Sequence, residues 1–120
     1  MPTHILWHQG ESDAAGNTTV ADYKMKFMEI VKTIRGTKIN APIYLAVATH
    51  CGTTPELFSR GVRHAQKELV DIQNGIFPGP DTDTIGTEDR VDDCHMSSSG
   101  LQKHSELWFK AIIQAPLLSK

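Results

Sequence analysis

The sequence predicts an α/β domain built around a parallel β-sheet. Apolar runs of strand length alternate with segments of helical periodicity along the 120 residues, an order typical of βαβ units. The run at residues 43–48 is apolar almost throughout, as central parallel strands are when helices cover both faces. No repeat or low-complexity segment divides the chain, and its length fits one domain. We therefore expect residues 1–120 to form a single domain.

The first part of the chain predicts a strand, a loop and a helix. Residues 5–9 form the first predicted strand, and the small and polar residues 13–17 form a loop. Thr18 or Thr19 can cap the helix that follows, and Gly36 stands at its end. The apolar stripe of this helix has the helical period and consists of Val20, Tyr23, Phe27, Ile30, Val31 and Ile34. One face of the helix is therefore expected to be buried.

A second helix follows the apolar strand at residues 43–48. Thr54 is its predicted cap, Pro55 takes the first helical position, and the helix ends at residues 74–75. Its apolar stripe consists of Phe58, Val62, Ala65, Leu69 and Ile72. This helix should pack on the same sheet.

The last third of the chain predicts a long loop and a final helix. Residues 76–92 are rich in Pro, Gly, Asp and Thr, so we expect a loop with at most a short strand at residues 84–86. The final helix begins after the serines at 97–99 and ends at Pro116. Its stripe consists of Leu101, His104, Leu107, Trp108, Ala111 and Ile112.

Composition argues against several function classes. The formal net charge is −2 and no basic run occurs, so nucleic-acid binding is not expected. No apolar stretch is long enough to cross a bilayer, so no membrane association is expected. The first residues do not resemble a signal peptide; the localisation stays unknown, and is cytoplasmic if Met1 is the natural start. A small neutral or acidic substrate fits this balance.

The two cysteines are expected to be free thiols. Cys51 and Cys94 could pair, but a single pair in a chain of this size is not a disulfide framework. Together with His50 and His95 they also offer metal-ligand types, yet their spacing matches no common zinc pattern. We expect no metal and no cofactor.

Polar residues gather where the predicted strands end, the edge at which open parallel sheets bind ligands. Asp92 can fix the tautomer of His95, which would then act as a general base in acyl transfer. Gln9 could donate to an oxyanion, an interaction worth about 3 kcal/mol. The alternative is structural: Asp92 or Asp93 caps a turn, and Gln9 and Glu11 tie a loop to the sheet.

Ser12 is a second candidate for chemistry. It lies in Gly-Glu-Ser-Asp-Ala after the first predicted strand, an arrangement similar to a Gly-x-Ser-x-Gly nucleophile elbow. The final glycine of that motif is replaced by Ala14. Ser12 is therefore a weaker candidate than the Asp–His pair.

Two blocks carry a family resemblance: WHQGESD at residues 7–13, and RVDDCH at 90–95 followed by Ser-Gly at 99–100. Together they resemble the SGNH-hydrolase superfamily, and more narrowly its carbohydrate-esterase and sialate O-acetylesterase branch. The resemblance implies a three-layer, flavodoxin-like fold. It also implies removal of acetyl groups from carbohydrate, sialic acid or xylan-like, by a serine, a histidine and an aspartate without metal or cofactor.

The same resemblance assigns roles to individual residues. It makes His95 the general base and Asp92 its acid partner. Gln9, Gly10 and Glu11 are placed in oxyanion or substrate binding, with backbone N–H groups assisting and Glu11 organising the site through hydrogen bonds.

The sequence departs from the family pattern at the nucleophile. The family serine lies in a Gly-Gln-Ser-Asn type block upstream of the Trp-His-Gln-Gly-Glu block, and this sequence contains no such block. We therefore expect a partial domain that is inactive alone. The alternatives are an inert remnant acting in assembly or carbohydrate binding, and a site completed by a partner's serine. The strand at residues 5–9 would have an unpaired edge, which predicts a homodimer or a swapped oligomer.

Overall fold

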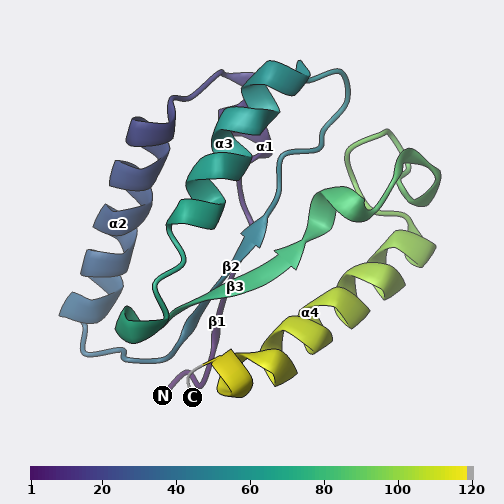
Figure 1. The fold of residues 1–120 in the computed structure, drawn as a ribbon. Coiled ribbons are helices and arrows are strands. Elements are labelled where there is room, and N and C mark those ends of the chain that lie inside the picture. The colour runs from purple at the N-terminus through teal and green to yellow at the C-terminus, as the bar shows by residue number, and fades with distance from the viewer. Residues whose placement is uncertain (119–120) are drawn as a thin grey trace.

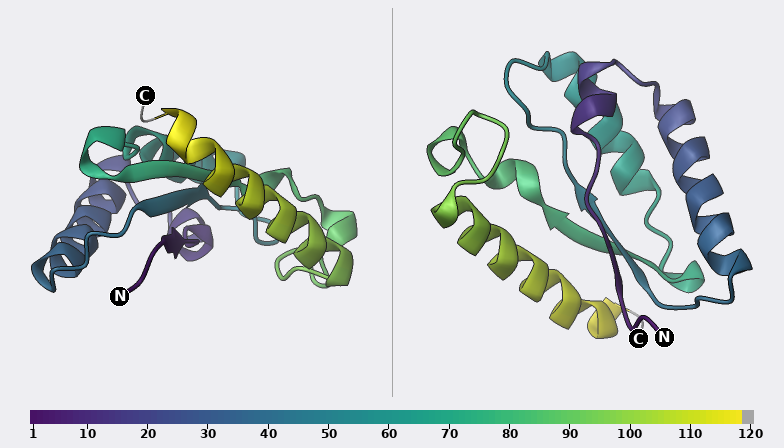
Figure 2. Two further views of the ribbon diagram at one scale, coloured as in Figure 1. Left: turned by 90° about the horizontal axis from the view of Figure 1, so that it is seen from below. Right: turned by 180° about the vertical axis from the view of Figure 1, so that it is seen from behind.

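The computed structural model, described here for residues 1–118, is a three-stranded parallel sheet with helices on both faces (Figure 1). The strand order is β1-β2-β3, formed by Ile5–Trp7, Ile43–Val47 and Ile76–Asp81. Figure 2 shows α4 on one face of the sheet, with α2 and α3 on the other. The predicted α/β fold class is confirmed.

The central strand β2 is buried along its whole length, as its apolar sequence predicts. On one face Ile43 and Leu45 pack in the larger core cluster with residues of α2 (Val20–Gly36) and α3 (Glu56–Glu68). On the other face Tyr44 and Ala46 pack against Trp108 of α4 (Ser98–Leu118). This two-sided burial makes β2 the centre of the domain.

Strand β1 lies at an edge of the sheet. It pairs with β2 in the register Ile5 with Ile43 and Trp7 with Leu45, and within residues 1–118 no strand pairs with its other side. It ends at Trp7, two residues earlier than expected. The side chain of Leu6 is 49% exposed.

The helices begin close to their predicted starts. Thr19 caps α2 by accepting a hydrogen bond from the backbone N–H of Asp22. Pro55 is the N-cap of α3 rather than its first residue, and the Thr54 hydroxyl donates instead to the carbonyl of Cys51. None of the helices in the described part of the chain is long and apolar enough to cross a membrane.

Several secondary-structure predictions are wrong. Helix α3 ends at Glu68 instead of at residues 74–75, and Ile72–Asn74 form a separate short 3-10 helix. Residues 76–81 form β3 instead of a loop; its prolines, at 78 and 80, are tolerated because β3 is the other edge of the described sheet. Glycine suits position 79 because a Cβ there would lie 2.7 Å from the backbone of Ala46. Residues Glu11–Ala15 form the short helix α1 instead of a loop, and α4 continues through Pro116.

The prediction of free thiols is also wrong. Cys51 and Cys94 form a disulfide across 43 residues of sequence. Cys51 follows β2, and Cys94 lies in the loop before α4, so the two loops meet at the carboxyl edge of the sheet. Sequence spacing carries no information about that approach, because the fold alone brings the loops together.

Candidate active site

The Asp92–His95 pair forms as predicted. His95 Nδ1 lies 2.7 Å from Asp92 Oδ2, and Asp92 Oδ1 accepts the backbone N–H groups of His95 at 2.7 Å and Cys94 at 3.0 Å. These hydrogen bonds lower the pKa of Asp92 to about 2, and the backbone N–H of His95 contributes more than its side chain. The ionised carboxylate holds the proton of His95 on Nδ1 and leaves Nε2 free to accept one. The His95 side chain is 78% exposed.

Arg90 holds the loop that carries this pair. It is 8% exposed, and its guanidinium donates to the carbonyls of Ile85 at 3.0 Å, Thr82 at 3.1 Å and Cys94 at 2.6 Å. The backbone N–H of Val91 also donates to the carbonyl of His95 at 2.9 Å. Together with the disulfide, these bonds hold His95 at the carboxyl edge of the sheet.

His95 lines a pocket of about 510 Å³, which we call the His95 pocket. Its lining consists of His8, Glu11, Ser12, Cys51, Arg90, Cys94, His95 and Met96. The structure therefore brings Glu11 and Ser12 of the first sequence block together with His95 of the second. Among the described residues, no hydrogen bond joins Ser12 to His95.

Glu11 is fixed by neighbouring histidines. Its Oε1 lies 2.8 Å from Nε2 of His8, whose Nδ1 lies 3.0 Å from Nε2 of His104 on α4. Burial opposes ionisation of Glu11, but the hydrogen bond with His8, a backbone hydrogen bond and the charge of His8 together outweigh it and lower the pKa of the carboxyl. Burial lowers the pKa of His104, and the nearby charge of His8 adds to this effect. An ionised Glu11 therefore lines the His95 pocket.

The structure does not bring the Gln9 amide together with His95. The amide nitrogen of Gln9 donates to Asp13 Oδ2 at 2.5 Å, and the side chain lines another pocket with Trp7 and Phe27. The carbonyl of Gln9 accepts the Tyr23 hydroxyl at 2.9 Å. These contacts match the structural alternative for Gln9, a side chain that ties its loop to the fold.

Gly10 is required by close packing. Its φ is 155°, and a Cβ there would collide with the carbonyl of Ala48 and the amide of Gln66. Only glycine fits this position. Gly10 is the N-cap of α1, so its backbone N–H and carbonyl lie beside Glu11.

Comparison with known proteins identifies the family. Residues 3–114 match the family model described as carbohydrate esterase, sialic acid-specific acetylesterase. The chain belongs to this carbohydrate esterase family. The match spans both blocks, so the resemblance seen in the sequence is confirmed. Searches of curated proteins and of solved structures found no match to the chain.

Two contributors to the candidate site escaped sequence reasoning. Gln66 of α3 is fully buried and joins the first block to β2: its amide donates to the carbonyl of Gln9 at 2.9 Å and accepts the N–H of Ala48 at 3.1 Å. In the sequence, the burial of Gln66 is indicated only by its position beside the apolar stripe of α3. The other is a second Asp–His pair, His50 Nε2 to Asp93 Oδ1 at 2.8 Å, which the sequence marks only by the cysteines beside both residues.

Proposed function

We propose that this chain provides the acid–base side of a serine-dependent esterase that deacetylates carbohydrate. The observation that carries the proposal is the Asp92–His95 pair, with an ionised carboxylate on Nδ1 and a free, exposed Nε2. An imidazole held in this way is suited to take a proton from a hydroxyl at neutral pH. Family membership supports acetylated carbohydrate as the substrate class.

The proposed reaction has two halves. His95 Nε2 takes the proton of a serine hydroxyl while the serine oxygen attacks the acetyl carbonyl carbon, and returns that proton to the departing sugar oxygen. Water then attacks the acetyl-enzyme, again losing a proton to His95, and acetate leaves while the proton returns to the serine oxygen. Glu11, fixed by His8, would orient the sugar through hydrogen bonds.

We propose that the nucleophilic serine comes from polypeptide outside this sequence. Ser12 lines the His95 pocket, yet its side chain makes no hydrogen bond to a base among the described residues. The unpaired edge of β1 supports pairing with a strand of that further polypeptide. In the purified chain the same edge supports self-association, as a homodimer or a swapped oligomer. Light scattering of the purified chain should then give twice the monomer mass, and a monodisperse monomer would contradict the assembly.

The activity experiment compares hydrolysis of 4-nitrophenyl acetate by the unmodified chain and three variants. Because the purified chain lacks the proposed serine, the proposal expects slow turnover in which His95 activates water directly on this reactive ester. His95→Ala should lower that turnover by about 10²-fold or more, since general bases contribute this much. His64→Ala is the matched control, because His64 is also an exposed imidazole beside a carboxylate, that of Glu68 at 3.2 Å. It should leave the rate unchanged.

Ser12→Ala decides the nucleophile. An unchanged rate supports a serine outside this sequence, and loss of activity would assign the role to Ser12. Equal rates for His95→Ala and the unmodified chain would overturn the proposed function.

A further inference from the structure

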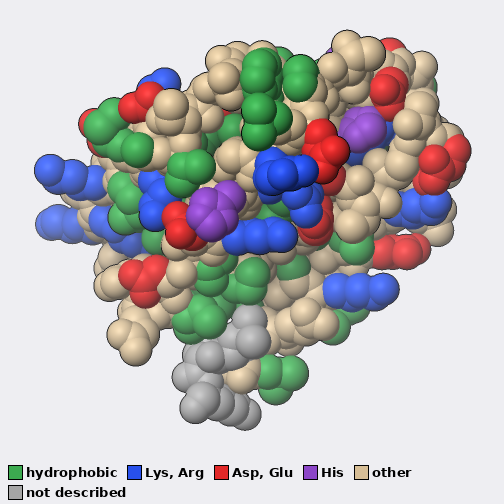
Figure 3. Space-filling view, turned by 45° about the horizontal axis from the view of Figure 1, so that its top comes forward, with side chains coloured by type: hydrophobic (Ala, Val, Ile, Leu, Met, Phe, Trp, Pro, Cys, Tyr) green, Lys and Arg blue, Asp and Glu red, His purple; other side chains and the backbone are tan. Residues whose placement is uncertain are grey.

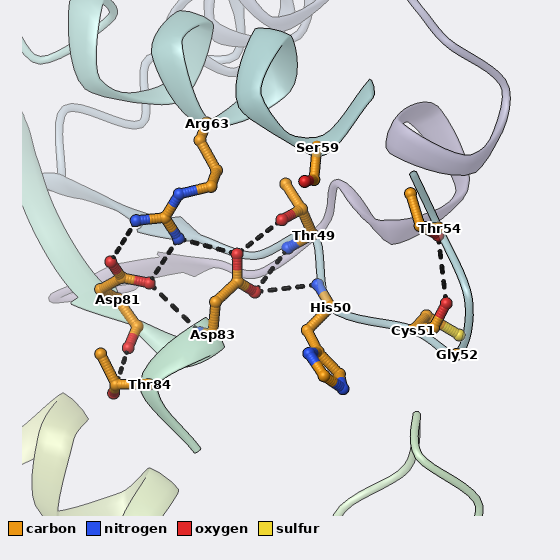
Figure 4. Close-up of a pocket in the computed structure, with 10 residues that line it drawn as sticks. All are labelled: Thr49, His50, Cys51, Gly52, Thr54, Ser59, Arg63, Asp81, Asp83 and Thr84. Atoms are coloured by element: carbon orange, nitrogen blue, oxygen red, sulfur yellow. Dashed lines mark hydrogen bonds and ion pairs between the residues drawn. The ribbon is translucent and has the colours of Figure 1, made fainter. Parts of the chain in front are cut away.

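A second pocket lies across the disulfide from His95, at the carboxyl ends of β2 and β3 (Figure 4). Its volume is about 360 Å³, within the range of about 300–1,000 Å³ found for small-molecule sites. We call it the Arg63 pocket, after the guanidinium that α3 places in its wall. Cys51 lines both this pocket and the His95 pocket, so the two adjoin at the disulfide.

The charges of the Arg63 pocket are fixed before any ligand binds. Arg63 Nη1 donates to Asp81 and Asp83, each at 2.8 Å, and Nη2 donates to Asp81 at 2.6 Å. Burial opposes ionisation of Asp83, but hydrogen bonds, chiefly from Thr49, outweigh it and lower the pKa of its carboxyl. Hydrogen bonds to Asp81 raise the pKa of Arg63. Two carboxylates therefore face one guanidinium, and the excess charge is negative.

This balance disfavours an anionic ligand. The end-on fork of Arg63, formed by Nη1 and Nη2, already holds Asp81. The carboxylates of Asp81 and Asp83 would also repel a further anion at the remaining N–H groups of Arg63. Among the described residues that line the His95 pocket, the basic side chain is that of Arg90. Its guanidinium N–H groups already donate to backbone carbonyls. Around this part of the surface Figure 3 shows acidic and basic side chains intermingled rather than a basic patch.

The Arg63 pocket instead offers hydrogen-bonding groups suited to hydroxyls. Within the described residues, Nε–H and the second Nη2 N–H of Arg63 have no protein partner. The hydroxyls of Thr54, Ser59 and Thr84 donate to the carbonyls of Cys51, Glu56 and Asp81. Their oxygens therefore keep lone pairs that can accept. A sugar hydroxyl both donates and accepts, so it can use both kinds of group.

We propose that the Arg63 pocket is a second sugar subsite, which binds an uncharged residue of the glycan whose acetylated residue lies at His95. The inference rests on the proposed function, because it places the acetyl group in the His95 pocket. It also sets the substrate class: a neutral O-acetylated oligosaccharide rather than a sialoside. The groups of the subsite are pre-ordered by the Arg63–Asp81–Asp83 bonds, which lowers the entropy cost of binding.

The test is an NMR titration of the ¹⁵N-labelled chain with xylotriose, an uncharged oligosaccharide without acetyl groups, and in parallel with the methyl glycoside of N-acetylneuraminic acid. Xylotriose should shift amide signals of residues 49–54 and 84 as well as 94–95, and the sialoside should bind more weakly. Ser59→Phe should fill the pocket and weaken xylotriose binding about tenfold or more.

Ser105→Phe is the matched control. Ser105 also lies on a helix and donates its hydroxyl to the carbonyl three residues earlier, at 2.8 Å, as Ser59 does at 3.0 Å. This variant should bind xylotriose like the unmodified chain.

Three outcomes would overturn the subsite. Shifts confined to the His95 pocket, with equal affinity in Ser59→Phe, would leave the proposed function standing without a second subsite. Tighter binding of the sialoside would refute the neutral substrate. No binding of xylotriose would remove the subsite, while the His95→Ala rate would still decide the esterase proposal, because hydrolysis of 4-nitrophenyl acetate needs no second sugar.

Discussion

Two Asp–His pairs flank the disulfide. Their N···O distances are nearly the same, but their histidine side chains differ in exposure to solvent. The N···O distance is 2.7 Å for Asp92–His95 and 2.8 Å for Asp93–His50. The backbone N–H of His50 also donates to Asp83 at 2.9 Å, and its side chain is 29% exposed. The His95 side chain is 78% exposed. The Asp93–His50 pair is hydrogen-bonded within the fold, whereas His95 of the other pair lines the His95 pocket.

The difference lies in which imidazole nitrogen each pair uses. His50 bonds through Nε2, the nitrogen far from the backbone, so its ring bridges the loop after β2 and the loop before α4. His95 bonds through Nδ1 to a residue three positions away, which leaves Nε2 without a hydrogen-bond partner among the described residues. The first arrangement anchors loops, and the second frees a base for proton transfer. In this protein, the imidazole nitrogen that bonds to the aspartate therefore distinguishes the structural pair from the pair suited to proton transfer.

The largest predicted effect concerns the disulfide that joins the two pairs. Replacing both cysteines, Cys51→Ser with Cys94→Ser, should lower the free energy of unfolding by roughly 4 kcal/mol, because the bond closes a loop across 43 residues. Urea unfolding followed by circular dichroism measures this. Unmodified protein treated with dithiothreitol is the control and should unfold at the same midpoint as the double variant. Two titratable thiols in the unfolded, unreduced protein would contradict the bond.

The next effect separates the two histidines by stability. His50→Ala should lower the free energy of unfolding by about 1 kcal/mol, because the hydrogen-bonded bridge between the two loops is lost. His95→Ala should change the free energy of unfolding by about 0.5 kcal/mol or less, since this side chain is exposed and its bond is local. Urea unfolding of both variants at neutral pH tests the difference. Equal losses would show that the two pairs play the same structural part.

The smallest effect is a pH dependence of the exposed pair. Asp92 should have a pKa of about 2 instead of its ordinary 3.8, because the N–H and side chain of His95 bond to the ionised carboxylate. Its stabilisation is complete above the ordinary value and is lost as the pH falls toward about 2. Carboxyl ¹³C NMR measures this titration. In His95→Ala the pKa should rise part of the way back, and an unshifted Asp92 in the unmodified chain would refute the pair.

Local patterns determined much of this molecule from the sequence. The apolar run that became β2, the periodic stripes of α2 and α3, and the Asp92–His95 pair were all predictable. Each depends on residues a few positions apart, so spacing and local hydrogen bonding are sufficient to define it. The family resemblance also followed from two short blocks, and the match over residues 3–114 confirms it.

Tertiary structure alone decided the contacts between distant segments. The Cys51–Cys94 bond, the His50–Asp93 bridge and the Arg63 pocket each join residues that meet only when parallel strands end at one edge. Tertiary structure also places β3 at an edge of the described sheet, where its prolines are tolerated. The physical reason is that sequence periodicity reports which face of an element is buried. It does not report which element packs there, and that partner sets the chemistry of each side chain.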